Sequence, residues 1–183
     1  MSRGSLLVAI DLPSRRRYEC DPVNEEEQKK LALELWNAGY QRQLQDDLEG
    51  AIDFYNRSIQ ICPTAEAHTF RGWAYEHLGR IDDAIAECRK AIEIDPDYGN
   101  PYNDIGAYLI AKGELDDAIP WLERAKQAAR YEPRHFPYLN LGRLYVAKGM
   151  FTAAAAEFAR ALEIEPNDQT SMQMLARLRA MLN

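Results

Sequence analysis

Residues 71–96 read RGWAYEHLGRIDDAIAECRKAIEIDP, and the pattern of small residues in this stretch decides the fold. Gly72, Ala84 and Ala91 lie 12 and then 7 positions apart, and the same spacings occur in three other stretches. The equivalent residues there are Gly39, Ala51 and Ser58, then Gly106, Ala118 and Ala125, then Gly142, Ala154 and Ala161. A unit of 33 to 36 residues that occurs four times predicts a solenoid, in which each unit packs on its neighbours.

Each unit has the apolar period of two helices joined by a tight turn. We expect the turns at Asp46, Gly79, Gly113 and Gly149, because these residue types tolerate the backbone of a tight turn. The expected helix pairs span residues 25–45 and 48–61, 65–78 and 81–94, 99–112 and 115–129, and 135–148 and 151–164. Asn24 and Glu27 predict a capping box at the first helix.

The copies resemble the tetratricopeptide repeat, a helix–turn–helix unit. Besides residues 71–96, the last copy carries the resemblance, from Leu141-Gly142-Arg143-Leu144-Tyr145 through Ala154 and Phe158 to Ala161-Leu162-Glu163-Ile164-Glu165-Pro166. The resemblance covers residues 32–166, and the first copy departs most, with Arg42 where Tyr75 and Tyr145 stand. It implies an all-α fold, a right-handed α-solenoid of antiparallel helix pairs.

The expected organisation has three parts. Residues 1–23 form an N-terminal tail without helical period, and residues 24–168 hold four repeats, at about 32–64, 65–98, 99–134 and 135–168. Residues 169–183 form a C-terminal capping helix, with Met172, Leu175 and Leu178 on its covered side.

The small residues at the repeated positions predict close contact between the two helices of a pair. Gly39, Gly72, Gly106 and Gly142 should face the second helix of their own copy. Large apolar side chains should fill the remaining space, namely Leu35, Phe54, Tyr75, Ile85, Ile105, Leu122, Leu141, Leu144 and Phe158. These residues build the scaffold and carry no information about a ligand.

A ligand site is expected on the flank of each first helix. At 100° per residue, this flank lies within about 40° to 100° of the repeated glycine. In tetratricopeptide arrays it lines the concave groove that receives a partner peptide. The candidate groove residues are Trp36, Tyr40, Phe70, Trp73, Asn103, Asp104, Asn140, Arg143 and Arg177. Trp36 and Phe70 are equally compatible with packing between neighbouring first helices, whereas Trp73 is expected to contact solvent.

Composition and motifs argue against several function classes. The formal net charge of -7 argues against nucleic acid as a partner, and no apolar run is long enough to span a membrane. Cys20, Cys62 and Cys88 predict neither a disulfide framework nor a metal site, which favours a reducing, cytoplasmic location. No phosphate-binding loop or nucleophile motif occurs. We therefore expect no enzyme, no cofactor and no metal.

Three functional hypotheses remain. The first is a non-enzymatic scaffold that binds a partner peptide or surface through the concave groove. The alternatives are a self-assembling homo-oligomer formed through the capping helix or the tail, and a chaperone-like assembly or secretion factor. Where the chaperone-tail clamp known from this family needs cations and amides, the flank has Trp36, Tyr40, Thr69, Trp73 and Asp104, so such a tail is not the expected ligand. The apolar stretch Leu6–Ile10 of the tail could also cover the groove.

Overall fold

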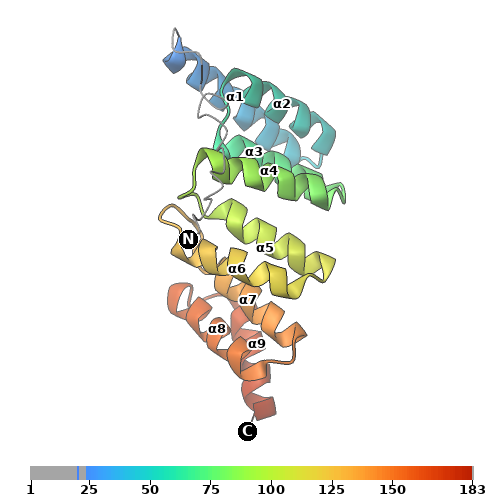
Figure 1. Cartoon of the computed structure of the whole chain (residues 1–183), viewed down its shortest axis with the longest axis vertical. Helices are drawn as coiled ribbons and strands as arrows, with labels where there is room; N and C mark the ends of the chain where they lie inside the picture. The colour runs from blue at the N-terminus through green and yellow to red at the C-terminus, as the bar shows by residue number, and fades with distance from the viewer. Residues whose placement is uncertain (1–19, 21–23, 183) are drawn as a thin grey trace, which may run out of the picture.

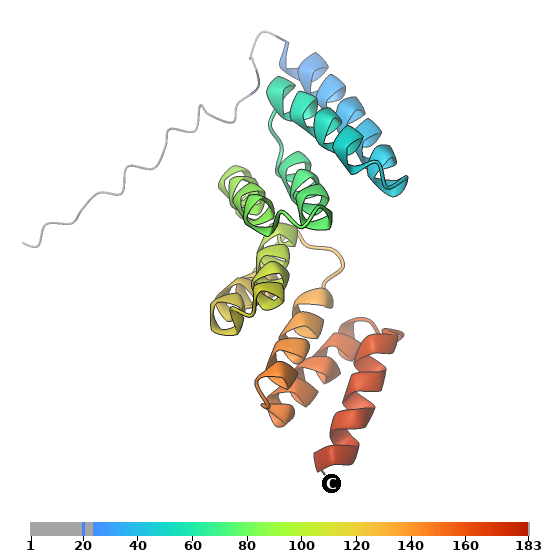
Figure 2. The same ribbon diagram turned by 90° about the vertical axis from the view of Figure 1, so that its right-hand side faces the viewer.

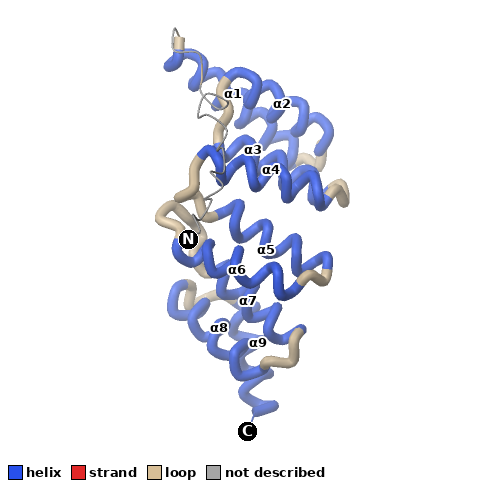
Figure 3. Tube along the Cα trace, viewed as in Figure 1, coloured by secondary structure: helices blue, strands red, loops and turns tan. Residues whose placement is uncertain are grey.

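The computed structural model describes Cys20 and residues 24–182, which form a stack of helices connected by short loops (Figure 1, Figure 3). The helices of this part of the chain are α1 (Glu25–Leu44), α2 (Leu48–Ile61), α3 (Ala65–His77), α4 (Ile81–Ile94), α5 (Asn100–Lys112), α6 (Leu115–Gln127), α7 (Phe136–Ala147), α8 (Phe151–Ile164) and α9 (Gln169–Leu182). Each helix end lies within two residues of its predicted position. The all-α solenoid predicted from the repeats is therefore confirmed. The hypotheses on the tail concern residues outside the described part.

The turns within the pairs have the predicted backbone. Gly79, Gly113 and Gly149 have φ angles of 74°, 80° and 71°, and Asp46 has a φ of 62° at the same place in the first pair. Positive φ costs glycine little, and an acidic residue with a short side chain tolerates it better than most others. The start of α1 differs from the prediction, because the Asn24 side chain makes no capping hydrogen bond.

Close contact within the pairs follows the repeated glycines. A Cβ atom at Gly106 would lie 2.5 Å from side-chain atoms of Leu122, and one at Gly142 would lie 2.7 Å from the ring of Phe158. In the first pair the residue opposite Gly39 is the fully buried Tyr55, whereas the predicted Phe54 is only partly buried. The sequence predicted Phe54 in place of Tyr55 because the two aromatic residues are adjacent and both fit the helical period to within one position.

The cysteine prediction is wrong in one respect. Cys20 and Cys62 form a disulfide with a Cα–Cα distance of 4.8 Å, while Cys88 is free and buried as predicted. The pairing could not be found from spacing because Cys20 lies in a stretch without helical period and Cys62 ends α2, 42 residues later. Disulfides persist mainly in oxidising compartments, so the cytoplasmic location stays a prediction.

The array curves toward its first helices. α1 contacts α3, α3 contacts α5, and α5 contacts α7, so these four helices adjoin one another along one surface of the bowed array (Figure 2). Helix α9 packs on α8, where Leu175 and Leu178 join Leu139 and Phe158 in one core cluster. Met172 is exposed, contrary to the prediction for the capping helix. No helix among the described residues is long and apolar enough to cross a membrane.

Candidate binding groove

A groove of about 770 Å³ runs along the surface shared by α3, α5 and α7. Six of the nine candidate residues line it, namely Phe70, Trp73, Asn103, Asp104, Asn140 and Arg143. They come from three successive first helices, which explains why the helical wheel found them. The structure thus brings these six residues together in one concavity.

The other three candidates lie outside this groove. Trp36 lines a second cavity, and Tyr40 contacts the rings of both Trp36 and Phe70. Arg177 is exposed on α9 and lines neither cavity. Their places are consistent with a surface that continues beyond the groove at both ends.

Aromatic rings form a continuous row at the N-terminal end of the groove. Trp36 stacks on Tyr40 with ring centroids 5.9 Å apart and meets Phe70 edge-on at 4.9 Å. Phe70 in turn lies 4.4 Å from Trp73. Trp36 and Phe70 also pack against the core cluster of Ala51, Ile52, Tyr55 and Ala74, so both are partly structural. Phe70 and Trp73 are the members of the row that line the groove.

A polar chain continues from Trp73 along the floor of the groove. The Trp73 Nε1 donates a hydrogen bond to Asp104 Oδ2 at 2.5 Å, and the Asn103 Nδ2 lies 3.4 Å from Asp104 Oδ1. The Asn140 Nδ2 donates to Asn103 Oδ1 at 2.9 Å. These bonds connect three repeats and fix the orientation of the amides that face the groove.

Asp104 is the most perturbed carboxyl of this surface. Burial raises its pKa, and the nearby Glu76 raises it further. The hydrogen bonds from Trp73 and Asn103 oppose this shift, and the resulting pKa is about 7 instead of 3.8. The described residues form no ion pair with Asp104, which accounts for the dominance of burial.

Residues 130–133 form a wall of the groove that helical periodicity did not predict. Tyr98 and Arg130 form an isolated parallel β-bridge, in which the Gly99 N–H donates to the Arg130 carbonyl at 2.8 Å. This bridge places Tyr131 against Gly99, where it lines the groove together with Tyr98. The Tyr131 hydroxyl is buried without a hydrogen-bond partner. The only sequence signal for this wall is the two extra residues of the third copy.

Arg143 and Asp168 lie at the C-terminal end of the groove. Arg143 is exposed and forms no ion pair within the described part of the chain. Burial would raise the pKa of Asp168, but hydrogen bonds from Ser171 and the charges of His135 and Arg143 outweigh it and lower the pKa. The predicted basic end therefore contains a carboxylate beside its arginine.

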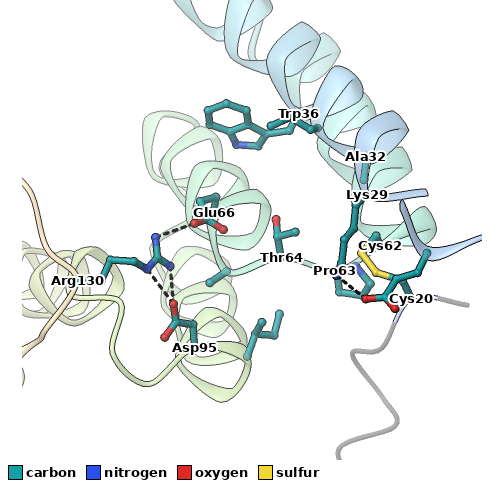
Figure 4. Close-up of a pocket in the computed structure, with 14 residues that line it drawn as sticks. Cys20, Lys29, Ala32, Trp36, Cys62, Pro63, Thr64, Glu66, Asp95 and Arg130 are labelled. Atoms are coloured by element: carbon teal, nitrogen blue, oxygen red, sulfur yellow. Dashed lines mark hydrogen bonds and ion pairs between the residues drawn. A yellow bond between two sulfur atoms is a disulfide. The ribbon is translucent and has the colours of Figure 1, made fainter. Parts of the chain in front are cut away.

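A second cavity of about 830 Å³ lies between α1, the α2–α3 connection and Arg130. Figure 4 shows Arg130 held between Glu66 and Asp95 on one side of this cavity, with the disulfide on the other side. Because Arg130 also lines the groove, this residue lies between the two cavities. The buried Trp36 Nε1 has no hydrogen-bond partner among the described residues.

Family models for the tetratricopeptide repeat match residues 65–98 and 97–166, together more than half of the chain. In Saccharomyces cerevisiae, small glutamine-rich tetratricopeptide repeat-containing protein 2 is 31% identical over 99 residues, which cover 54% of this chain and 29% of that protein. The chain spans less than a third of the length of the curated relatives it matches most strongly.

Solved structures share the fold. The pilF protein of Pseudomonas aeruginosa superimposes with a TM-score of 0.78 at 21% identity, over 83% of this chain and 69% of that chain. The second tetratricopeptide domain of Spaghetti, solved with the HSP90 peptide SRMEEVD, has a TM-score of 0.53 at 24% identity over 56% of this chain and 98% of its own. The matched repeats and the helix pairs agree, and the chain belongs to the tetratricopeptide repeat family.

Proposed function

We propose that this protein is a non-enzymatic scaffold that binds an extended segment of a partner protein in the groove between α3, α5 and α7. The observation that carries the proposal is the row of aromatic and amide side chains that lines one concavity of about 770 Å³. Aromatic side chains bury much area at little entropic cost, and amides can pair with a peptide backbone. Because the groove is already formed, mainly the partner segment loses conformational entropy on binding.

The relatives support a role in protein interaction. The matched family consists of helical repeats that stack into extended concave surfaces. One structural neighbour was solved with a bound peptide. Cys88, the free thiol, is buried, and burial raises its pKa well above the usual range, so it is a poor nucleophile.

The proposal is tested by selecting peptides from a random display library on the immobilised protein and measuring their affinity by calorimetry. The double variant Trp73→Ala plus Arg143→Ala should weaken binding about tenfold or more, because central aromatic and arginine contacts dominate peptide affinity. The matched control Trp121→Ala plus Arg160→Ala changes the same residue types on the second helices α6 and α8.

Equal affinity of the wild type and the groove variant would contradict the proposal, provided that circular dichroism shows both to be folded. A loss of affinity in the control variant alone would place the binding surface on the second helices.

Self-association remains the second candidate. Met181 and Leu182 are 63% and 50% exposed near the end of α9, which leaves apolar surface on the capping helix. Light scattering over a range of protein concentrations distinguishes this candidate, since a dimer that forms through α9 should dissociate in the variant Met181→Glu plus Leu182→Glu.

A further inference from the structure

Asp104 is a half-buried carboxylate on the wall of the groove that no cation of the described residues compensates. Its two hydrogen-bond donors are the neutral groups of Trp73 and Asn103. A carboxylate removed from water is costly unless it is paired with a cation, so a site of this kind is completed by a ligand of opposite charge.

The rings around Asp104 suit a cation as well. Phe70 and Trp73 line the same groove, and cations are attracted to the faces of aromatic rings. The face of Tyr98 is already covered by the Arg130 guanidinium, 4.1 Å from the ring centroid. Tyr131 is only 4% exposed, and its hydroxyl oxygen, which can accept a hydrogen bond, has no partner. Because this hydroxyl is buried, it is closed to a ligand in the groove, and a cation is left with the Asp104 carboxylate and the exposed rings.

The charged residues that line the groove also favour a cationic ligand. Its acidic lining residues are Asp104, Glu132 and Asp168, and its basic ones are Arg130 and Arg143. Arg130 forms ion pairs with Glu66 and Asp95, and these two carboxylates neutralise its charge, so it does not compensate Asp104. Arg143 lies at the far end, close enough to lower the pKa of Asp168.

We infer that Asp104, with the rings of Phe70 and Trp73, forms a subsite for a cationic side chain, arginine or lysine, of the bound segment. This inference rests on the proposed function of the groove. The cation pairs with the Asp104 carboxylate and lies against the ring of Trp73. Trp73 and Asn103 hold the carboxylate in position for this contact.

The test uses small probes that need no knowledge of the partner. N-acetyl-arginine-N-methylamide, its lysine analogue and its neutral citrulline analogue are titrated at pH 8 into the full chain labelled with ¹⁵N. The Trp73 indole N–H, assigned with the variant Trp73→Phe, reports on the site because it donates directly to Asp104. The arginine or lysine probe should shift this resonance saturably, and the citrulline probe should bind about tenfold more weakly or not at all.

Two variants separate the charge from the fold. Asp104→Asn keeps an acceptor for Trp73 but removes the charge, so it should lose about tenfold or more in affinity for the cationic probes while its melting temperature stays equal or rises. Tyr131→Phe should bind like the wild type, because its hydroxyl is buried away from the probe. The control Asp117→Asn replaces an exposed aspartate on α6 and should bind like the wild type.

Equal shifts by the arginine and citrulline probes, or unchanged binding by Asp104→Asn, would overturn the subsite. Selected peptides that still depend on Trp73 and Arg143 would then leave the proposed function standing. The opposite outcome is also distinguishable. If the probes bind with cation specificity but the double groove variant binds peptides like the wild type, the Asp104 subsite stands and the proposed function of the groove is refuted.

The chain itself contains the run Arg15-Arg16-Arg17, which offers the same guanidinium chemistry as a partner. Replacing the three arginines by glutamine distinguishes the two sources. Unchanged probe affinity assigns the natural cation to another molecule, whereas an increase shows that the chain's own arginines compete for the same subsite.

Discussion

A buried and a half-buried carboxylate on neighbouring helix pairs have opposite surroundings. Glu87 of α4 is 4% exposed and accepts hydrogen bonds from His68 at 2.7 Å, from Arg71 at 2.5 Å and 2.9 Å, and from Lys90 at 2.8 Å. Asp104 of α5 has only neutral donors. Burial alone would raise both pKa values, but the partners of Glu87 outweigh burial and lower its pKa to about 2.

The charge of Glu87 is used within the fold, whereas the charge of Asp104 is available to a ligand. The Arg71 side chain joins Glu87 to Asn56, so the saturated network connects α2, α3 and α4 and has no capacity for a ligand. Asp104 lies on the concave side with its charge unmatched and its pKa at about 7. Strongly perturbed ionisable groups of the second kind are typical of functional sites.

The largest effect is expected from removing the saturated carboxylate. Glu87→Ala leaves the half-buried guanidinium of Arg71 without its partner, and we expect the free energy of unfolding to fall by about 3–5 kcal/mol. Urea denaturation followed by circular dichroism measures it. The control Asp82→Ala removes an exposed carboxylate of the same helix and should change stability by about 0.5 kcal/mol or less. Equal effects of the two variants would remove the contrast between the two carboxylates.

A packing variant tests the helix pair that positions Asp104. Gly106→Leu would force side-chain atoms into Leu122 on α6, and we expect a loss of about 1–3 kcal/mol or more in a thermal melt. Ala111→Leu makes a similar change at an exposed position of α5 and serves as the control. An unchanged melting temperature for Gly106→Leu would refute the assigned contact.

Removing the uncompensated charge should have the opposite sign to removing Glu87. Asp104→Asn keeps the acceptor and removes the ionised group, so we expect the free energy of unfolding at pH 8 to rise by about 1–2 kcal/mol. A loss of stability would mean that the ionised form of Asp104 is well compensated and that the two carboxylates are alike.

The smallest expected effect is the pH dependence of stability, which has opposite signs for Asp104 and Glu87. The pKa of Asp104 is raised from 3.8 to about 7, so the folded state binds this proton more tightly and stability falls as pH rises through this window. Glu87 has the reverse sign, and its contribution is lost as pH falls from 4.5 toward 2. The stability difference between Asp104→Asn and the wild type should therefore grow from pH 4 to pH 7 and stay constant above. A difference that is flat with pH would contradict the raised pKa.

Periodicity predicted most of the helical structure and part of the groove. The turns and the helix ends followed from glycines, prolines and apolar spacing, and six groove residues followed from their angle to the repeated glycine. The wall at Tyr131 did not, because it depends on a β-bridge between two non-helical segments that are 32 residues apart. The Cys20–Cys62 bond was missed for the same reason, since no local pattern places Cys20.

Arg130 has a consequence for how the array unfolds. Contacts in an ideal solenoid join only adjacent units, so such arrays lose their repeats one by one from the ends. Arg130 follows α6 in the third repeat, and it pairs with Glu66 at the start of α3, 64 residues earlier, and with Asp95 at the end of α4. These pairs add to the contact between the adjacent second and third repeats, so we expect these two repeats to open together. Native-state hydrogen exchange should show the amides of α3 to α6 opening together, while α9 and α1 open at lower free energy.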